Sequence, residues 1–200
     1  MANVSRVNGF TPVQHLTGAP YNGQYRTYAV PASDGTALGV GDVVKALASS
    51  SSITTSGQTT SYKNVTRAAA GDAVLGVIVG FDIVPDALNT PQYRVASTLR
   101  TVRVADATDL VFLVQTSNGT PAAANVGLNF NAAVGSVSTT TGLSGSTLDL
   151  NGGTGGGATA TFKLLQWDAA PDNDNSSTGN KALVKINNHQ YNGGTGTAGV

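Results

Sequence analysis

The feature that most constrains this chain is a Gly-Asp sequence that occurs twice, each time directly before an apolar run. Residues 41–44 read GDVV and residues 71–74 read GDAV, and the full runs are GDVVKAL and GDAVLGVIVGF. Gly-Asp is typical of turns, and short Val-rich runs are typical of strands. A Ser/Thr tract at 49–61 separates the two units and is expected to be a polar loop. Two strands that begin at similar turns predict a small antiparallel barrel or sandwich.

The composition also favours β-structure. All 11 acidic residues are aspartate, which prefers turns, and glutamate, which prefers helices, is absent. Charged residues make up 11% of the chain, well below the ~25% that is usual for soluble domains. Low charge is typical of interface cores, so we expect a partner to cover part of the surface. Cysteine is absent, which excludes thiol catalysis and cysteine-based zinc sites.

Further apolar runs divide the chain into strands and loops. The alternation at 98–105 predicts a strand with one buried face, and 109–116, apolar on both faces, predicts a central strand. One helical turn is expected within 121–127, which begins with proline and ends with glycine. The other expected strands are 24–30, 39–47, 62–66, 74–81, 159–167 and 181–188, with a short one in 146–150.

These elements predict an all-β chain with one main domain. The domain, at 24–188, is expected to be an antiparallel β-sandwich or β-barrel, jelly-roll-like in type. Its flanks are an extended N-terminal arm at 1–23 and a polar C-terminal tail at 189–200. The Gly/Ser-rich stretch 135–158 is expected to form long flexible loops.

The residues that could act in catalysis or in metal binding lack the sequence spacing that such sites require. His15 and His189 lie outside the HxH, HExxH and HxxxH patterns of metal sites. Asp172 and Asp174 lie in a loop without the glycine and the bidentate acid of a calcium loop, so a solvated turn is expected. No serine lies in a GxSxG motif. We therefore expect no enzymatic activity, no cofactor and no metal site.

Charge and hydropathy argue against two classes of partner. The formal net charge is zero and no basic run occurs, so binding to nucleic-acid phosphates is not expected. The longest apolar run, 74–81, is far shorter than the ~20 residues of a membrane span. The first residues also lack the pattern of a signal peptide. Neither nucleic acid nor a membrane is therefore expected as a partner.

The chain ends carry the residues that we expect at an interface. Tyrosine is enriched where a side chain contacts an apolar partner at one end and water at the other. Ordinary core packing is the alternative interpretation for the tyrosines near the first strand. The histidine in NNHQY, after the last strand, suits an interface hydrogen bond. The expected interface residues are Phe10, Pro12, His15, Leu16, Tyr21, Tyr25, His189 and Tyr191.

Four segments together resemble a known class of proteins. They are NGFTPVQHLTGAPYNGQYRTYAVPASDGTALGVGDVVK at 8–45, AAAGDAVLGVIVGF at 68–81, NTPQYRVASTLRTVRVADATDLVFLVQ at 89–115 and LVKINNHQYNGGTGTAGV at 183–200. All resemble structural proteins of tailed-bacteriophage heads. The order of a GD strand, a polar loop and an AAAGD strand is similar to that of head decoration, or cement, proteins.

This resemblance implies a structural virion protein on the outer surface of the phage head. It would bind the major capsid protein and cement neighbouring subunits against the pressure of packaged DNA. The resemblance also implies a homo-oligomer, with a trimer favoured over a dimer, made in the host bacterial cytoplasm. Two alternatives stay open. One is another virion component, such as a tail or fibre subunit. The other is a carbohydrate-binding module, for which Trp167 is the only tryptophan.

Overall fold

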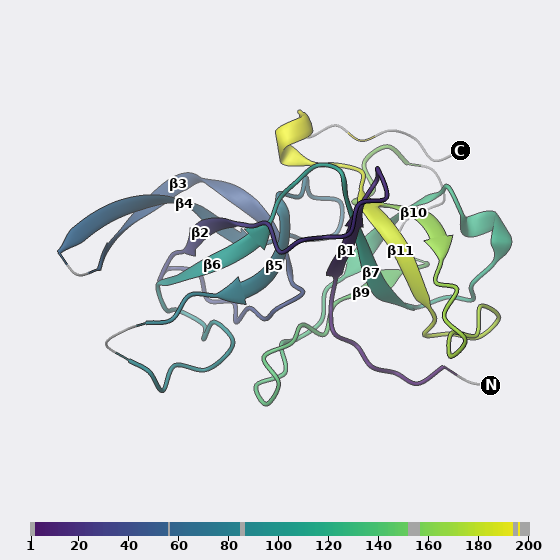
Figure 1. Cartoon of the computed structure of the whole chain (residues 1–200), viewed down its shortest axis with the longest axis horizontal. Coiled ribbons are helices and arrows are strands. Elements are labelled where there is room, and N and C mark those ends of the chain that lie inside the picture. Colours follow the sequence, from purple (N-terminus) through teal and green to yellow (C-terminus); the bar gives the residue numbers. More distant parts are fainter. Residues whose placement is uncertain (1–2, 56, 85–86, 152–156, 194–195, 197–200) are drawn as a thin grey trace.

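The computed structural model describes residues 3–55, 57–84, 87–151, 157–193 and 196, and these ranges form an all-β fold. Eleven strands and two short 3₁₀ helices make up two lobes that lie side by side (Figure 1). The strands are β1 (Thr11–His15), β2 (Arg26–Val30), β3 (Val43–Thr55), β4 (Gln58–Arg67), β5 (Gly76–Phe81), β6 (Arg100–Ala105), β7 (Leu110–Ser117), β8 (Asn129–Ala133), β9 (Thr147–Asp149), β10 (Phe162–Trp167) and β11 (Lys181–Ile186). The 3₁₀ helices are η1 (Ala123–Asn125), in the expected place, and η2 (Gln190–Asn192). The predicted all-β class is confirmed.

The first lobe is a closed barrel in the order β2-β4-β3-β5-β6. Its neighbouring strands are antiparallel except for β2 and β4, which run parallel where Ala29 lies opposite Asn64. The predicted alternation of β6 is confirmed, since Val102 and Val104 point into the barrel and are fully buried. Among the described residues, ring closure covers the edges of the strands within the barrel itself, which limits unwanted strand pairing there.

The second lobe is a sheet in the order β1-β7-β11-β10-β8-β9. Because β9 also pairs with β7, with Thr116 opposite Leu148, strands β7, β11, β10, β8 and β9 form a second ring. Strand β1 is added to β7 beside that ring. The β7 strand is buried along most of its length on both faces, which confirms its predicted central position.

The two Gly-Asp sequences form the same local turn. In each, the N–H of the aspartate, Asp42 or Asp72, donates to the carbonyl three residues earlier at 3.2 Å. The glycine in between has a left-handed φ, 92° at Gly41 and 81° at Gly71, as a type II turn requires. Each aspartate carboxylate then accepts the N–H of the first residue of its turn, at 2.8 and 2.7 Å. The repeated motif is therefore a repeated structure.

The first aspartate is also a buried anchor for the Gly/Ser-rich stretch. Asp42 is fully buried, and its Oδ1 accepts hydrogen bonds from the hydroxyls of Ser144 at 2.6 Å and Ser146 at 3.2 Å. Both serines are themselves buried. The expectation of flexible loops at 135–158 is therefore wrong for this part, because buried hydroxyls need partners and find one in Asp42. Residues 152–156 lie outside the described ranges.

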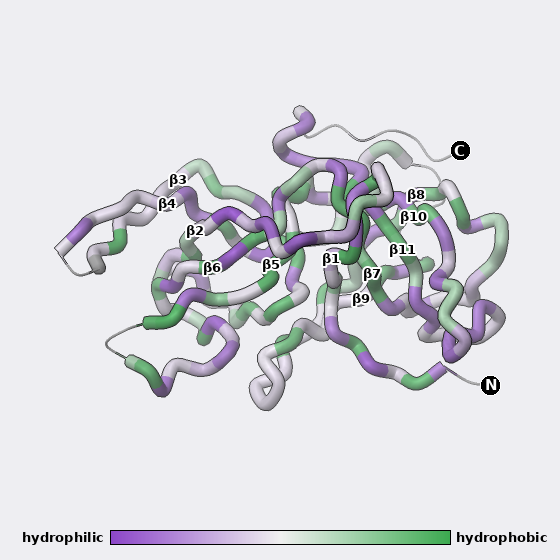
Figure 2. The backbone as a smooth tube through the Cα atoms, in the orientation of Figure 1, coloured by the Kyte–Doolittle hydropathy of each residue, from purple (hydrophilic) through white to green (hydrophobic). Residues whose placement is uncertain are grey.

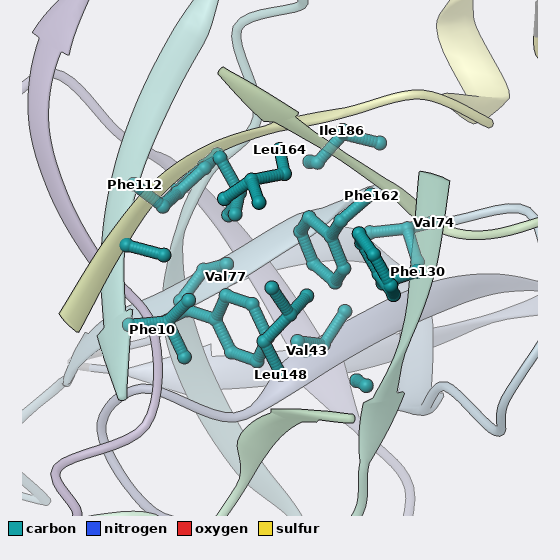
Figure 3. Close-up of a cluster of buried hydrophobic side chains, with 14 of the residues drawn as sticks. Phe10, Val43, Val74, Val77, Phe112, Phe130, Leu148, Phe162, Leu164 and Ile186 are labelled. Atoms are coloured by element: carbon teal, nitrogen blue, oxygen red, sulfur yellow. The ribbon is translucent and has the colours of Figure 1, made fainter. Parts of the chain in front are cut away.

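One apolar core joins the two lobes. Val43 and Val77 of the barrel pack in the same cluster as Phe112 of the second lobe (Figure 3). Phe10 and Phe162 stack within it, with ring centroids 4.4 Å apart and planes at 15°. Burying an aromatic side chain of this size is strongly favourable. The lobes are thus packed on shared side chains.

The N-terminal segment is part of this body and does not form the arm expected at 1–23. Strand β1 pairs with β7, and Phe10 is buried in the shared core. The prediction of Phe10 as an interface residue is wrong, because the ring lies between the lobes. Of the tail expected at 189–200, residues 189–193 fold back as η2 and its flanks, while 194–195 and 197–200 are outside the described residues.

The Ser/Thr tract is a hairpin and not the expected loop. Strands β3 and β4 continue through it, pair from Ser50 opposite Lys63 to Thr55 opposite Gln58, and project from the barrel (Figure 1). Hydroxyl pairs bridge the two strands, Ser52 with Ser61 at 2.9 Å and Thr54 with Thr59 at 2.8 Å. Threonine favours strands, and such cross-strand pairs add stability.

Candidate functional site

Four of the predicted interface residues line one groove, at the point where the barrel passes into the second lobe. The groove lies between residues 106–110 on one side and His15, Tyr21, Tyr25 and Tyr191 on the other, and has a volume of about 650 Å³. We call it the junction groove. Figure 1 shows η2, in yellow, beside the teal loop that joins β6 to β7. Folding therefore brings residues from both ends of the chain into one site.

The exposed Tyr191 side chain is held by buried polar groups. Its hydroxyl lies 2.7 Å from that of Tyr28, which donates to Asp106 Oδ2 at 2.6 Å. Since the Tyr28 proton is used in that bond, Tyr191 is the donor to Tyr28. The Arg26 guanidinium lies 5.6 Å from the centre of the Tyr191 ring, and its Nη1 lies 3.5 Å from Asp106 Oδ2. A ring that is 53% exposed is thus fixed in place.

Two buried groups keep this network in one protonation state. Burial, assisted by the hydrogen bonds with Asp106 and Tyr191, raises the pKa of the Tyr28 hydroxyl, so it remains a donor. His189 is also buried, and its Nδ1 accepts the N–H of Tyr191 at 3.1 Å. Burial lowers the pKa of His189, against the opposing effect of Asp106, and favours the neutral ring that can accept this bond. The prediction of His189 as an interface residue is wrong, because its side chain lies inside and positions Tyr191.

A second exposed tyrosine is supported in a similar way. Tyr25 is 46% exposed, and the guanidinium of Arg103 lies 4.9 Å from the centre of its ring. Arg103 is itself fixed by Asp82, with Nε 2.6 Å from Oδ1. Each exposed ring therefore has an arginine beside it that is paired with an aspartate, a favourable cation–π arrangement.

His15 and Tyr21 belong to the lining of the groove, whereas Leu16 and Pro12 lie outside it. His15 Nδ1 lies 3.0 Å from Asp109 Oδ2, and the Tyr21 hydroxyl donates to the carbonyl of Gln24 at 2.8 Å. Leu16 is exposed, and its backbone N–H donates to the carbonyl of Asp109, a groove residue, at 2.8 Å. Pro12 lies in β1 opposite Phe112, so it belongs to the sheet. Asp106 could not have been found from the sequence, because it is far from Tyr191 along the chain and carries no motif.

A second surface feature is the connection between β5 and β6. Ile83 and Leu88 are 75% and 78% exposed, and Val95 and Leu99 are also exposed. We call the connection that carries these four side chains the apolar loop. Figure 2 shows green, hydrophobic stretches along it at the edge of the molecule. Ile83 and Leu88 line the same pocket, and exposed apolar side chains that lie together mark binding surfaces. The sequence signal was present, since Ile and Leu here lie in a proline-interrupted connection and not in a strand.

Two buried arginines fix the backbone behind the apolar loop. Arg94 is fully buried and donates to the carbonyls of Thr36, Pro31 and Thr98, the last two at 2.8 and 2.9 Å. Arg100 donates from Nη1 to the carbonyls of Pro91 and Tyr93, both at 2.6 Å. These bonds satisfy loop carbonyls that a buried connection would otherwise leave unpaired. The backbone around Val95 and Leu99 is thus held by buried side chains.

Other candidate positions in the sequence lie elsewhere. Trp167 packs against the shared core, and its Nε1 donates to the carbonyl of Ala122 at 3.2 Å. The Asp174 carboxylate accepts hydrogen bonds from Ser176 and Ser177, which lower its pKa. Within the described ranges, no three acidic or histidine side chains gather as a metal site, and no helix is long and apolar enough to cross a bilayer.

Comparison with known proteins gives no relative from which function could be transferred. No protein-family model matches the chain, and neither a curated protein nor a solved structure matches it significantly. Function is therefore inferred from the geometry of the junction groove and the apolar loop.

Proposed function

We propose that this protein is a structural component of a tailed-phage virion that binds the outer surface of the head. In this proposal it attaches to the major capsid protein and adds contacts across the joints between neighbouring subunits. The observation that carries the proposal is the apolar loop, in which Ile83 and Leu88 are 75% and 78% exposed and line one pocket. Large apolar side chains that are exposed in the free protein gain free energy when a partner buries them, which makes them suitable for attachment.

The scaffold behind this loop supports an adhesive role. The barrel closes on itself and the second lobe forms a further ring, so the apolar loop is not needed to complete either sheet. The chain is also poorly charged, at 11%. Depletion of charge with exposed large side chains is typical of the centre of protein interfaces.

Assembly would multiply the effect of each contact. We propose a homotrimer at a local symmetry axis of the capsid, with one apolar loop per subunit on the lattice. Once one subunit is bound, the others bind at a high effective concentration, so modest individual affinities suffice. The protein would be made in the host cytoplasm and would function on the outer head surface.

The proposal is tested by adding purified protein to parent capsids that lack it and measuring co-sedimentation. The double variant Ile83→Ser with Leu88→Ser should bind at least about tenfold more weakly, because it loses two anchors. The matched control is Val134→Ser, an exposed apolar residue outside this loop. Circular dichroism checks that all three proteins fold alike.

Two results would contradict the proposal. One is equal capsid binding by the double variant and the control, and the other is no binding of the unaltered protein. A cryo-electron microscopy map of the parent particle provides an independent check. Density for this chain on the head supports attachment to the capsid, whereas density on the tail or fibres would identify the alternative virion role.

A further inference from the structure

The junction groove has features that capsid attachment does not require. Its two exposed aromatic rings, Tyr25 and Tyr191, are each fixed by an arginine that is paired with an aspartate. Beneath Tyr191, the polar groups of Tyr28 and Asp106 are buried and bonded to one another. Buried polar networks are costly unless they are fully paired, so such a support for a half-exposed ring is typical of a prearranged binding surface.

The groove also offers polar groups beside the rings. His15 uses Nδ1 in its contact with Asp109, which leaves Nε2 for a ligand. The Arg26 side chain is largely exposed, at 68%, and its guanidinium provides donors at the rim. Gln24 and Thr108 contribute neutral polar groups to the lining. Donors and acceptors next to aromatic rings suit a ligand with both an apolar face and several hydroxyls.

The charge of the lining limits the ligand further. One arginine faces two aspartates, Asp106 and Asp109, and the remaining lining residues other than His15 are uncharged. A phosphorylated or sulfated ligand would meet like charges here, which destabilises binding. A neutral ligand is favoured.

We propose that the junction groove binds a neutral saccharide, with sugar rings stacked on Tyr25 and Tyr191 and their hydroxyls bonded to Arg26, His15 and Asp109. A pyranose has an apolar face of C–H groups and a rim of hydroxyls, which matches this combination of rings and polar groups. The volume of about 650 Å³ lies within the range of small-ligand sites. The apolar loop and the groove lie at opposite ends of β6, which begins at Arg100, next to Leu99, and ends at Ala105, next to Asp106. Saccharide binding at the groove is therefore independent of capsid attachment through the apolar loop.

The test uses the full chain on a surface of immobilised neutral oligosaccharides built from glucose, galactose, mannose and N-acetylglucosamine. Heparin, oligo(dT) and a proline-rich peptide are immobilised alongside. Binding to at least one neutral oligosaccharide is expected, and its affinity is then measured by calorimetry. Tyr25→Ala and Tyr191→Ala should each weaken that affinity at least about tenfold.

Three further variants make the result specific. Tyr62→Ala, on the β3–β4 hairpin away from the groove, should leave binding unchanged. Tyr191→Phe keeps the ring and should bind more tightly than Tyr191→Ala. The Ile83→Ser, Leu88→Ser double variant should keep its saccharide affinity, which separates this inference from the capsid proposal. If Tyr191→Ala unfolds, Tyr25→Ala decides, because no buried hydrogen bond depends on its side chain.

The inference is overturned if no neutral oligosaccharide binds. It is equally overturned if binding is insensitive to both tyrosine substitutions, or if only heparin, oligo(dT) or the proline-rich peptide is retained. Binding of the proline-rich peptide alone would identify the groove as a peptide site.

Discussion

The hydroxyl of Tyr28, in strand β2, lies 2.7 Å from the hydroxyl of Tyr191, in the C-terminal η2 turn. This contact joins β2 of the barrel to η2, the last helix among the described residues. Because Tyr28 also donates to the buried Asp106, one hydroxyl connects the barrel interior with the exposed surface of the junction groove. The position of Tyr191 therefore depends on a residue that is itself buried.

The Tyr28→Phe substitution tests this dependence. It keeps the ring but leaves Asp106 and Tyr191 without their shared partner, so the free energy of unfolding should fall by about 1–3 kcal/mol. Urea denaturation measures the change. The control is Tyr62→Phe on the projecting hairpin, which should change stability little. Equal losses for both variants would show that the Tyr28 hydroxyl has no special role.

The two Gly-Asp turns provide a matched pair of substitutions. Gly71→Ala meets no atom within 4 Å, so it should cost only the left-handed backbone strain, about 1–2 kcal/mol. At Gly41 an added Cβ would lie 2.4 Å from the Asn8 carbonyl oxygen, so Gly41→Ala should cost a further ~1–3 kcal/mol. Thermal and urea unfolding of the two variants give the difference. A Gly71 variant less stable than the Gly41 variant would contradict this ranking.

Phe10 should matter for folding and not for attachment. Phe10→Ala removes a buried ring that stacks on Phe162 and should destabilise the protein by about 3–5 kcal/mol. Leu16→Ala, at an exposed position in the same segment, should change stability by less than about 0.5 kcal/mol. Deleting residues 1–20 should for the same reason destabilise the fold, since it removes β1 as well as Phe10. Native-like stability of the truncated chain would show that this segment is dispensable.

Stability should fall as the pH drops below neutral because of His189. Burial lowers its pKa in the folded state below the ordinary value of 6.5, so the unfolded chain binds more protons between these two values. The free energy of unfolding should be level above pH 6.5 and decrease below it, by at most ~1.4 kcal/mol per pH unit, until the folded-state pKa is passed.

Urea unfolding between pH 5 and 8 measures this slope. The comparison is His189→Gln, which has no titrating ring and should show a flatter profile over the same interval. An unchanged slope in that variant would assign the pH dependence to other groups, and the explanation through His189 would then be incorrect.

The predictable parts of the fold are those in which local pattern and final environment agree. The alternation of β6 and the apolar run of β7 identified a half-buried and a central strand, because strand faces are read directly from a period of two. The prediction of a loop for the Ser/Thr tract of β3 and β4 was wrong because its hydroxyls form hydrogen bonds with one another across the hairpin. Composition alone does not show such pairing. The prediction of an extended N-terminal arm was wrong because Phe10 is buried by side chains from strands far away in the sequence.

The candidate site also has features that the sequence predicts and features that only the tertiary structure decides. The sequence by itself determined an all-β chain, the two Gly-Asp turns and a set of tyrosines near the chain ends, because turn chemistry and strand periodicity are local properties. Only the tertiary structure decided that His15, Tyr25 and Tyr191 share a groove while Phe10 and His189 are buried. The reason is physical: burial and the partner of each polar group are set by strands far apart in the chain, and the contact of Tyr28 with Tyr191 joins residues 163 positions apart in the sequence.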